Sequence, residues 1–204
     1  MADKNDLSVF TNIYHHYKHR KQRPESYSGE GSTMAQTAVI REEIPALLRK
    51  VGAKVLLDAP CGDFNWMSVV DLPVDKYIGA DIVKEIIEED TAKYASPSRE
   101  FIHRDLSADP LPKADVIFCR DCLVHLPFTI VAQVLGNFKK SGSTYLIATT
   151  FTDRTENVDI HPGGWRTLNM ALPPVNLGEP LFLINEKCPV EGYGDKCLGL
   201  WKIN

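Results

Sequence analysis

The chain contains 204 residues, of which 44% are hydrophobic and 25% charged, and its formal net charge at pH 7 is −4. This composition is typical of one folded domain and argues against a nucleic-acid partner, because phosphate binding usually requires a basic surface. No apolar run approaches the roughly 18 residues that cross a bilayer, and the amino terminus has no signal-peptide pattern. We therefore expect a cytoplasmic protein without membrane insertion, in which the five cysteines are reduced.

Residues 1–33 are expected to form an amino-terminal arm and a loop. The aromatic and basic stretch 14–21 either contacts an anionic or sugar ligand or belongs to a solvated helix packed by its aromatic face. The serine- and glycine-rich stretch 26–33 is either a linker or a loop that folds over a ligand. A helix is predicted over 34–51, interrupted by Pro45.

The stretch 55–67 is the most informative part of the chain. Its apolar start predicts a strand that ends in Asp58, followed by a tight turn and a helix start. A dinucleotide site would require several glycines to approach a pyrophosphate, but the turn has only Gly62, with Pro60 and Asp63 at the other positions. The acids instead suit a ligand with a cationic ammonium group, and an NAD-dependent oxidoreductase is disfavoured.

Two further predicted strands also end near acids. The strand at 76–80 ends in Asp81, 23 residues after Asp58, where nucleotide-binding α/β proteins place a carboxylate that accepts hydrogen bonds from ribose. The short strand at 101–103 is followed by Asp105. Because parallel strands end at one edge of a sheet, these acids are expected to lie near a common ligand.

A fourth strand over 114–119 is nearly all apolar and leads into Arg120 and the residues after it. Together, the four strand ends resemble those of class I S-adenosylmethionine (SAM)-dependent methyltransferases, over about residues 47–151. The first turn is similar to their motif D-x-G-x-G-x-G, with Asp58, Cys61 and Gly62 in matching places. The resemblance implies a Rossmann-like α/β sandwich over residues 1–204. Its mostly parallel, seven-stranded sheet would have the order 3-2-1-4-5-7-6, with strand 7 antiparallel and helices on both sides. A final hairpin at 181–185 and 197–202 agrees with it.

The same resemblance implies SAM as cofactor. Asp105 would face the adenine amino group with Leu106 beside the ring, although Asp105 could also be a simple turn acid. Arg120 would pair with a cofactor carboxylate, with an acidic acceptor group, or only with a neighbouring acid. The expected cofactor contacts are Asp58, Pro60, Gly62, Trp66, Asp81, Asp105, Leu106 and Arg120.

Methyl transfer to a hydroxyl requires a base, for which His125 and Asp121 are the candidates. They are four residues apart, so on a helix they would share one face, and Asp121 could orient His125 or act as the base itself. The alternative is that His125 only contacts the backbone at a helix start.

The segment 152–178 is expected to be a loop or lid on the acceptor side, or a simple connection. Its candidate substrate contacts are Asp153, Trp165, Arg166 and Asn169. This polar and aromatic set suits stacking on and hydrogen bonding to a sugar, so we expect O-methylation of a sugar or glycan hydroxyl, in association with or fused to glycosyltransferases. The alternatives are methylation of a small non-sugar metabolite and a non-catalytic nucleotide-binding module.

A divalent metal remains an alternative at this stage. The side chains that could converge as magnesium ligands are Asp121, Asp153, Asp159 and His161. Cys119 and Cys122 have the C-x-x-C spacing, but no second pair follows at the spacing of a structural zinc site, so core thiols are favoured. We assign no metal ligand from the sequence.

Overall fold

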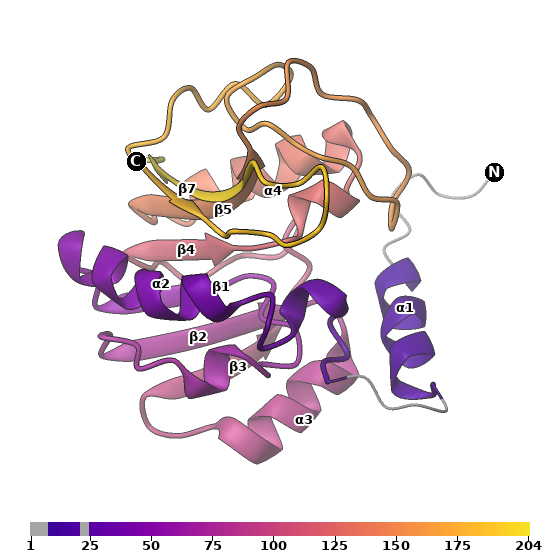
Figure 1. The fold of residues 1–204 in the computed structure, drawn as a ribbon. Helices are drawn as coiled ribbons and strands as arrows, with labels where there is room; N and C mark the ends of the chain where they lie inside the picture. The colour runs from indigo at the N-terminus through magenta and orange to yellow at the C-terminus, as the bar shows by residue number, and fades with distance from the viewer. Residues whose placement is uncertain (1–7, 21–24) are drawn as a thin grey trace.

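The computed structural model describes residues 8–20 and 25–204, and residues 1–7 and 21–24 of the predicted arm lie outside this description. Seven strands form one sheet in the order β3-β2-β1-β4-β5-β7-β6 (Figure 1). Strands β1 to β5 pair in parallel, whereas β7 pairs antiparallel with both β5 and β6. The predicted strand order and the antiparallel strand 7 are confirmed. The strands are β1 Val55–Asp58, β2 Lys76–Asp81, β3 Arg99–His103, β4 Val116–Cys119, β5 Tyr145–Phe151, β6 Phe182–Asn185 and β7 Lys196–Lys202.

The central strands are buried on both faces. All four residues of β4 are buried, and successive residues of a strand contribute to different hydrophobic clusters. Leu57 and Ile117 belong to one cluster, whereas Leu56 and Val116 belong to the other. This alternation follows from the two-residue period of a strand, and it explains why these segments read as continuous apolar runs.

Helices cover the two faces of the sheet. Buried residues of α4 join the cluster of Leu57, and buried residues of α2 join the cluster of Leu56, so these helices lie on opposite faces. Figure 1 shows α1 beside the carboxyl ends of the parallel strands, next to α3. No helix among the described residues has the length and hydropathy to cross a bilayer. The helices are α1 Ser8–Lys18, α2 Ala38–Lys50, α3 Lys84–Tyr94 and α4 Phe128–Lys140.

Two local predictions were wrong. The expected helix after the first turn is only a short 3-10 turn, Met67–Val69, because the chain runs into the proline-containing segment 70–75. The second wrong prediction concerns Pro45, which does not interrupt α2, since the helix continues through it.

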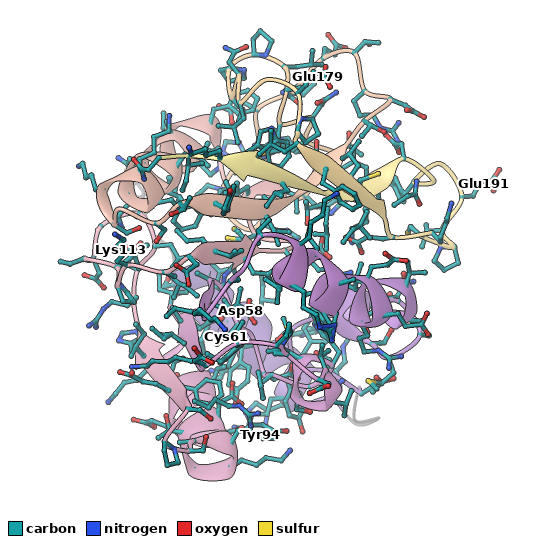
Figure 2. All side chains as sticks on the ribbon, turned by 90° about the vertical axis from the view of Figure 1, so that its left-hand side faces the viewer. Asp58, Cys61, Tyr94, Lys113, Glu179 and Glu191 are labelled. Carbon is teal, nitrogen blue, oxygen red and sulfur yellow. The ribbon has the colours of Figure 1, made fainter. Side chains whose placement is uncertain are left out.

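Figure 2 shows Asp58 and Cys61 inside the molecule, at the point where β1 ends, while Lys113, Glu179 and Glu191 lie at its rim.

Replacing Ile117 by alanine should destabilise the protein by about 2–5 kcal/mol, because its side chain is fully buried in the central strand and the change leaves a cavity. The measurement is urea denaturation followed by circular dichroism. Val158→Ala serves as control, since Val158 is 62% exposed and should change the free energy of unfolding little. An equal effect of both substitutions would contradict the packing described here.

Candidate active site

A cavity of about 620 Å³ lies at the carboxyl ends of the parallel strands. Its volume is in the range of sites for small molecules and cofactors. It is lined by α1, by the loop at 27–32, by the ends of β1 to β5, and by the approach to β7. The sequence-predicted residues that line it are Asp58, Pro60, Gly62, Trp66, Asp81, Asp105, Leu106, Arg120, Asp121, His125 and Trp165.

Asp58 is buried at the end of β1 and accepts a hydrogen bond of 2.6 Å from the Tyr77 hydroxyl. Burial, with a contribution from the charge of Asp81, raises the pKa of Asp58 to about 8. The carboxyl group is therefore largely protonated at pH 7 in the free protein. A cationic group in the cavity would favour its ionised form.

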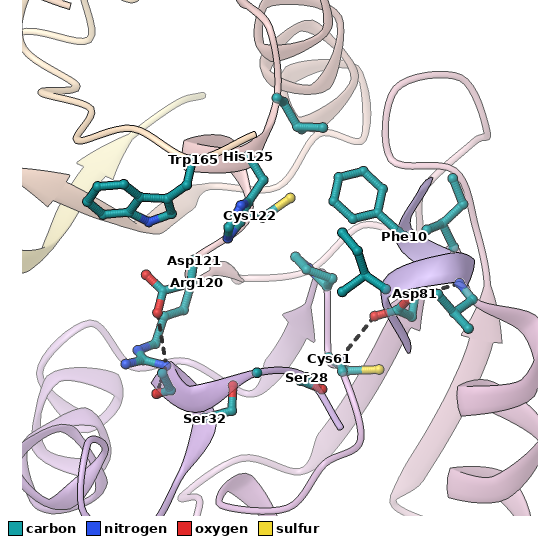
Figure 3. Close-up of a pocket in the computed structure, with 18 of the residues that line it drawn as sticks. Phe10, Ser28, Ser32, Cys61, Asp81, Arg120, Asp121, Cys122, His125 and Trp165 are labelled. Carbon is teal, nitrogen blue, oxygen red and sulfur yellow. Dashed lines mark hydrogen bonds and ion pairs between the residues drawn. The ribbon is translucent and has the colours of Figure 1, made fainter. Parts of the chain in front are cut away.

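Asp81 at the end of β2 organises the first turn. Its carboxylate accepts hydrogen bonds from the backbone N–H groups of Gly62 (3.1 Å) and Val83 (2.9 Å), and Figure 3 shows it beside Cys61. Gly62 has a φ of 55°, and a Cβ at this position would lie 2.2 Å from Ser28 Oγ. Only glycine combines this backbone conformation with so close an approach of the neighbouring loop.

The neighbouring loop is folded over the turn. The carboxylate of Asp63 accepts hydrogen bonds from Ser26 Oγ (3.1 Å), Tyr27 N–H (2.7 Å) and Ser28 Oγ (3.3 Å). Residues 27–32 then line the cavity. Of the two sequence interpretations of this stretch, the structure agrees with a loop that folds over the site.

Helix α1 forms a wall of the same cavity through Phe10, Ile13, Tyr14 and Tyr17. It is anchored to α3 by a 3.0 Å hydrogen bond from the Tyr14 hydroxyl to Glu89, by an ion pair of Lys18 with Glu89, and by a 3.3 Å contact of His15 with Glu85. The sequence indicated the helical spacing of the aromatic residues. It left open whether the stretch contacts a ligand, because helical periodicity gives a buried face but not its partner.

Asp105 and Leu106 follow β3. Asp105 Oδ1 accepts hydrogen bonds from the backbone N–H (2.8 Å) and the hydroxyl (2.6 Å) of Ser107, which fixes the turn. Leu106 is buried, and all three residues line the cavity. Asp105 is therefore a turn acid that also lies at the site.

Arg120 takes part in a buried ion pair within the protein. Its guanidinium donates to the Glu186 carboxylate at 2.7 Å and 3.2 Å and to the Gly31 carbonyl at 2.9 Å. The side chains of Arg120 and Glu186 are 4% and 2% exposed. Of the three partners considered from the sequence, the structure shows a neighbouring acid, but one that lies 66 residues further along the chain.

Asp121 pairs with a second cation, Lys196. Asp121 Oδ2 lies 2.7 Å from Lys196 Nζ and 3.3 Å from Arg120, while Thr149 accepts a 2.8 Å hydrogen bond from the Asp121 backbone N–H. Burial opposes ionisation, but the charges of Arg120 and Lys196 outweigh it and lower the pKa of Asp121 to about 2. An acid this strong is a poor general base at neutral pH.

His125 lies in the 3-10 turn Leu123–His125 and not on an α-helix, since α4 begins only at Phe128. The predicted common helical face with Asp121 is therefore wrong. His125 Nδ1 lies 2.7 Å from the Gly164 carbonyl oxygen. A carbonyl only accepts, so Nδ1 carries the hydrogen and Nε2 is left as an acceptor. Burial lowers the pKa of His125, which favours this neutral form at pH 7.

The loop that holds His125 also contacts α1. Gly163 N–H donates a 3.0 Å hydrogen bond to the His125 carbonyl, and Arg166 N–H donates one of 3.1 Å to the Val124 carbonyl. A Cβ on Gly163 would lie 2.7 Å from Val9 Cγ2, so α1 packs directly on this glycine. Helix α1, which forms a wall of the cavity, therefore packs against the segment that holds His125.

An aromatic cluster lines the cavity near β5 and the approach to β7. The Trp165 ring is 5.0 Å from that of Tyr193 and 6.1 Å from that of Phe151, both in edge-on arrangements, and Trp165 is 46% exposed. Figure 3 shows Trp165 next to His125. The sequence predicted Trp165 but not Phe151, Tyr193 or Lys196.

The other three predicted substrate contacts do not line the cavity. Arg166 donates a 2.7 Å hydrogen bond to the Leu126 carbonyl. The Asn169 side chain donates to the Arg154 carbonyl at 3.0 Å, and Asp153 is exposed. The side chains of Arg166 and Asn169 donate to backbone carbonyls of irregular segments, which explains why they turn away from the cavity.

The magnesium ligands considered from the sequence do not assemble. Within residues 8–20 and 25–204, no three His, Cys, Asp or Glu side chains gather as ligands for a metal ion. Asp159 accepts a 2.8 Å hydrogen bond from the Phe128 N–H at the start of α4, and Asp121 is held by Lys196. The residues present therefore do not fit a bound divalent metal.

No family model and no curated protein sequence matches this chain. Solved structures do match it. Magnesium protoporphyrin IX methyltransferase from Synechocystis PCC 6803 with bound SAM aligns with a TM-score of 0.66 and 15% identity, over 99% of this chain and 98% of that chain. The N-methyltransferase NodS from Bradyrhizobium japonicum WM9 in complex with S-adenosylhomocysteine (SAH) gives 0.65 and 12%, over 95% and 97%. Phosphoethanolamine N-methyltransferase 1 from Haemonchus contortus gives 0.63 and 11%, over 96% of this chain and 48% of that chain. The chain therefore has the fold of the class I SAM-dependent methyltransferases.

Replacing Arg120 by methionine should destabilise the fold by about 3 kcal/mol or more, because Glu186 would lose its bidentate partner while remaining buried. The double variant Arg120→Met with Glu186→Met should lose less than the sum of the single effects, as measured by denaturant unfolding. Lys76→Met, which removes an exposed ion pair with Glu100, is the control and should cost at most about 1 kcal/mol. Additive effects of the two buried substitutions would contradict the coupling.

Proposed function

We propose that the protein is a SAM-dependent methyltransferase that methylates a hydroxyl group of a neutral sugar or glycan. The observation that carries this proposal is the state of His125. Its Nδ1–H is bonded to the Gly164 carbonyl, which leaves Nε2 to accept a proton in the same cavity as the acids at the ends of β1 and β2. An enzyme that transfers methyl to a hydroxyl requires such a base, whereas a binding module does not.

The carboxyl ends of the strands supply a set of groups suited to SAM. Asp81 would accept hydrogen bonds from the ribose hydroxyls, and Leu106 would pack on the adenine beside Asp105. Asp58 would face the ammonium group of the cofactor and ionise on binding. Two of the structures with this fold contain SAM or SAH, which supports the same assignment here.

The acceptor side supports a neutral, ring-shaped acceptor. Two cations, Arg120 and Lys196, are balanced by two anions, Asp121 and Glu186, so this wall has no net charge to recognise a charged acceptor. The rings of Trp165 and Tyr193 would stack on the apolar faces of a sugar. We further propose that the protein acts in the cytoplasm together with glycosyltransferases.

In the proposed reaction, SAM supplies an electrophilic methyl group on its sulfonium. The chain's own residues position the acceptor oxygen, exclude water and remove the proton. The acceptor hydroxyl would donate to His125 Nε2, and its proton would pass to this atom as the oxygen bonds to the methyl carbon. Asp121 stays ionised and holds Lys196.

Replacing Asp81 by asparagine should weaken the binding of SAM and SAH by about 1–3 kcal/mol, because the ribose hydroxyls would lose a charged acceptor. Isothermal titration calorimetry measures this effect, with the melting temperature of each variant as a check on folding. Asp71→Asn makes the same chemical change at an exposed site and should leave the affinity unchanged. The cofactor assignment would be wrong if the wild-type protein bound neither ligand.

Replacing His125 by glutamine should lower kcat for sugar methylation by about 10²- to 10⁴-fold while SAH affinity is kept. A base acts in its neutral form, and burial lowers the pKa of His125 from its usual value of 6.5. The wild-type rate should therefore rise with pH and level off, with a midpoint below 6.5. The assay is transfer of radiolabelled methyl to a panel of monosaccharides, with exposed His19→Gln as control. Undiminished turnover by His125→Gln would exclude His125 as the base.

A further inference from the structure

Lys196 is a cation at the acceptor side that the sequence did not indicate. It begins β7, opposite Phe151 of β5, and lines the cavity. Its Nζ lies 2.7 Å from Asp121 Oδ2 and 3.5 Å from Glu186 Oε2, and its side chain is 12% exposed. The ammonium group is therefore held at a defined position by two carboxylates.

The geometry leaves part of this ammonium for a ligand. An ammonium group has three N–H donors, and the two carboxylates engage at most two of them. Among the described residues, no other side chain pairs with Lys196 Nζ. Since Lys196 lines the cavity, the remaining donor is available to an oxygen atom that enters it.

Lys196 and His125 act on the same region of the cavity. The positive charge of Lys196 contributes to the lowered pKa of His125, after the larger effect of burial. Asp121 interacts with both residues, because its charge acts on His125 and its carboxylate oxygen binds the Lys196 ammonium. An acceptor hydroxyl that donates to His125 Nε2 thus lies in the field of the ammonium group.

We propose that Lys196 is a catalytic residue whose ammonium donates a hydrogen bond to the acceptor oxygen. This inference rests on the proposed methyl transfer. The acceptor O–H bond breaks and its proton passes to His125 Nε2. In the same step the oxygen forms a bond to the methyl carbon, and the electron pair of the broken carbon–sulfur bond stays on sulfur. Lys196 keeps its proton and stabilises the negative charge that develops on the oxygen.

A purely structural role would make Lys196 only the counter-ion of Asp121. The double variant Lys196→Met with Asp121→Asn separates the two roles, because it removes both members of the pair and leaves the net charge of the protein unchanged. Lys202→Met, on the exposed end of the same strand, is the matched control. Melting temperatures and SAH affinity establish that each variant is folded and binds its ligand.

The test uses 4-nitrophenol as a probe of negative charge on an acceptor oxygen, added to the full chain saturated with SAH. The wild-type protein and Lys202→Met should bind the phenolate about 10- to 100-fold more tightly than the phenol, as measured by absorbance titration at several pH values. The double variant should lose this preference. Retention of the preference by the double variant, or its absence in the wild-type protein, would overturn the proposal.

This readout does not depend on turnover, so it distinguishes the two proposals. Phenolate preference without sugar methylation would refute the proposed acceptor class and leave the role of Lys196 intact. Sugar methylation without phenolate preference would support the proposed function and refute the role of Lys196. Where the wild-type protein does methylate a sugar, kcat of the double variant should fall at least tenfold.

Discussion

The proposed acceptor side of this protein depends on two cations and two anions that neutralise one another. The side chains of Arg120 and Glu186 are buried, whereas those of Asp121 and Lys196 are partly exposed. Arg120 follows β4, Glu186 follows β6 and Lys196 begins β7, so the network connects strands that are distant in sequence. The attraction between the two cations and the two anions offsets part of the cost of removing these charges from water. The same network also fixes Asp121 as an ion and holds the Lys196 ammonium at the cavity.

The cavity has two chemically different halves. On one side, Asp58 and Asp81 end strands β1 and β2 and Asp105 follows β3, so three carboxyl groups face the proposed cofactor. On the other side, Trp165 and Tyr193 offer aromatic rings beside a charge-neutral wall. The proposed reaction between a cationic methyl donor and a neutral acceptor agrees with this division.

His125 is held by the same segment that packs against helix α1. Its ring is oriented by the Gly164 carbonyl, while the adjacent Gly163 packs against Val9 of α1. Helix α1 also walls the cavity and is anchored to α3 through Tyr14. The position of His125 and the closure of the cavity therefore depend on the same packing.

The sequence determined the strands and the acids at their ends. Apolar runs of strand length are local signals, and parallel strands must present their carboxyl ends at one edge, so the positions of Asp58, Asp81 and Asp105 followed without coordinates. The strand order followed from resemblance to a known fold. His125 was predicted as a site residue, although the helix expected to carry it is a 3-10 turn.

Tertiary structure decided which side chains meet at the proposed acceptor side. Lys196 reaches Asp121 across 75 residues, and no periodicity in the chain connects them. Arg166 and Asn169 looked like ligand contacts, but they turn toward backbone carbonyls that need donors. In irregular segments the direction of a polar side chain is set by which backbone groups are left unsatisfied, and this is fixed only when the whole chain has packed.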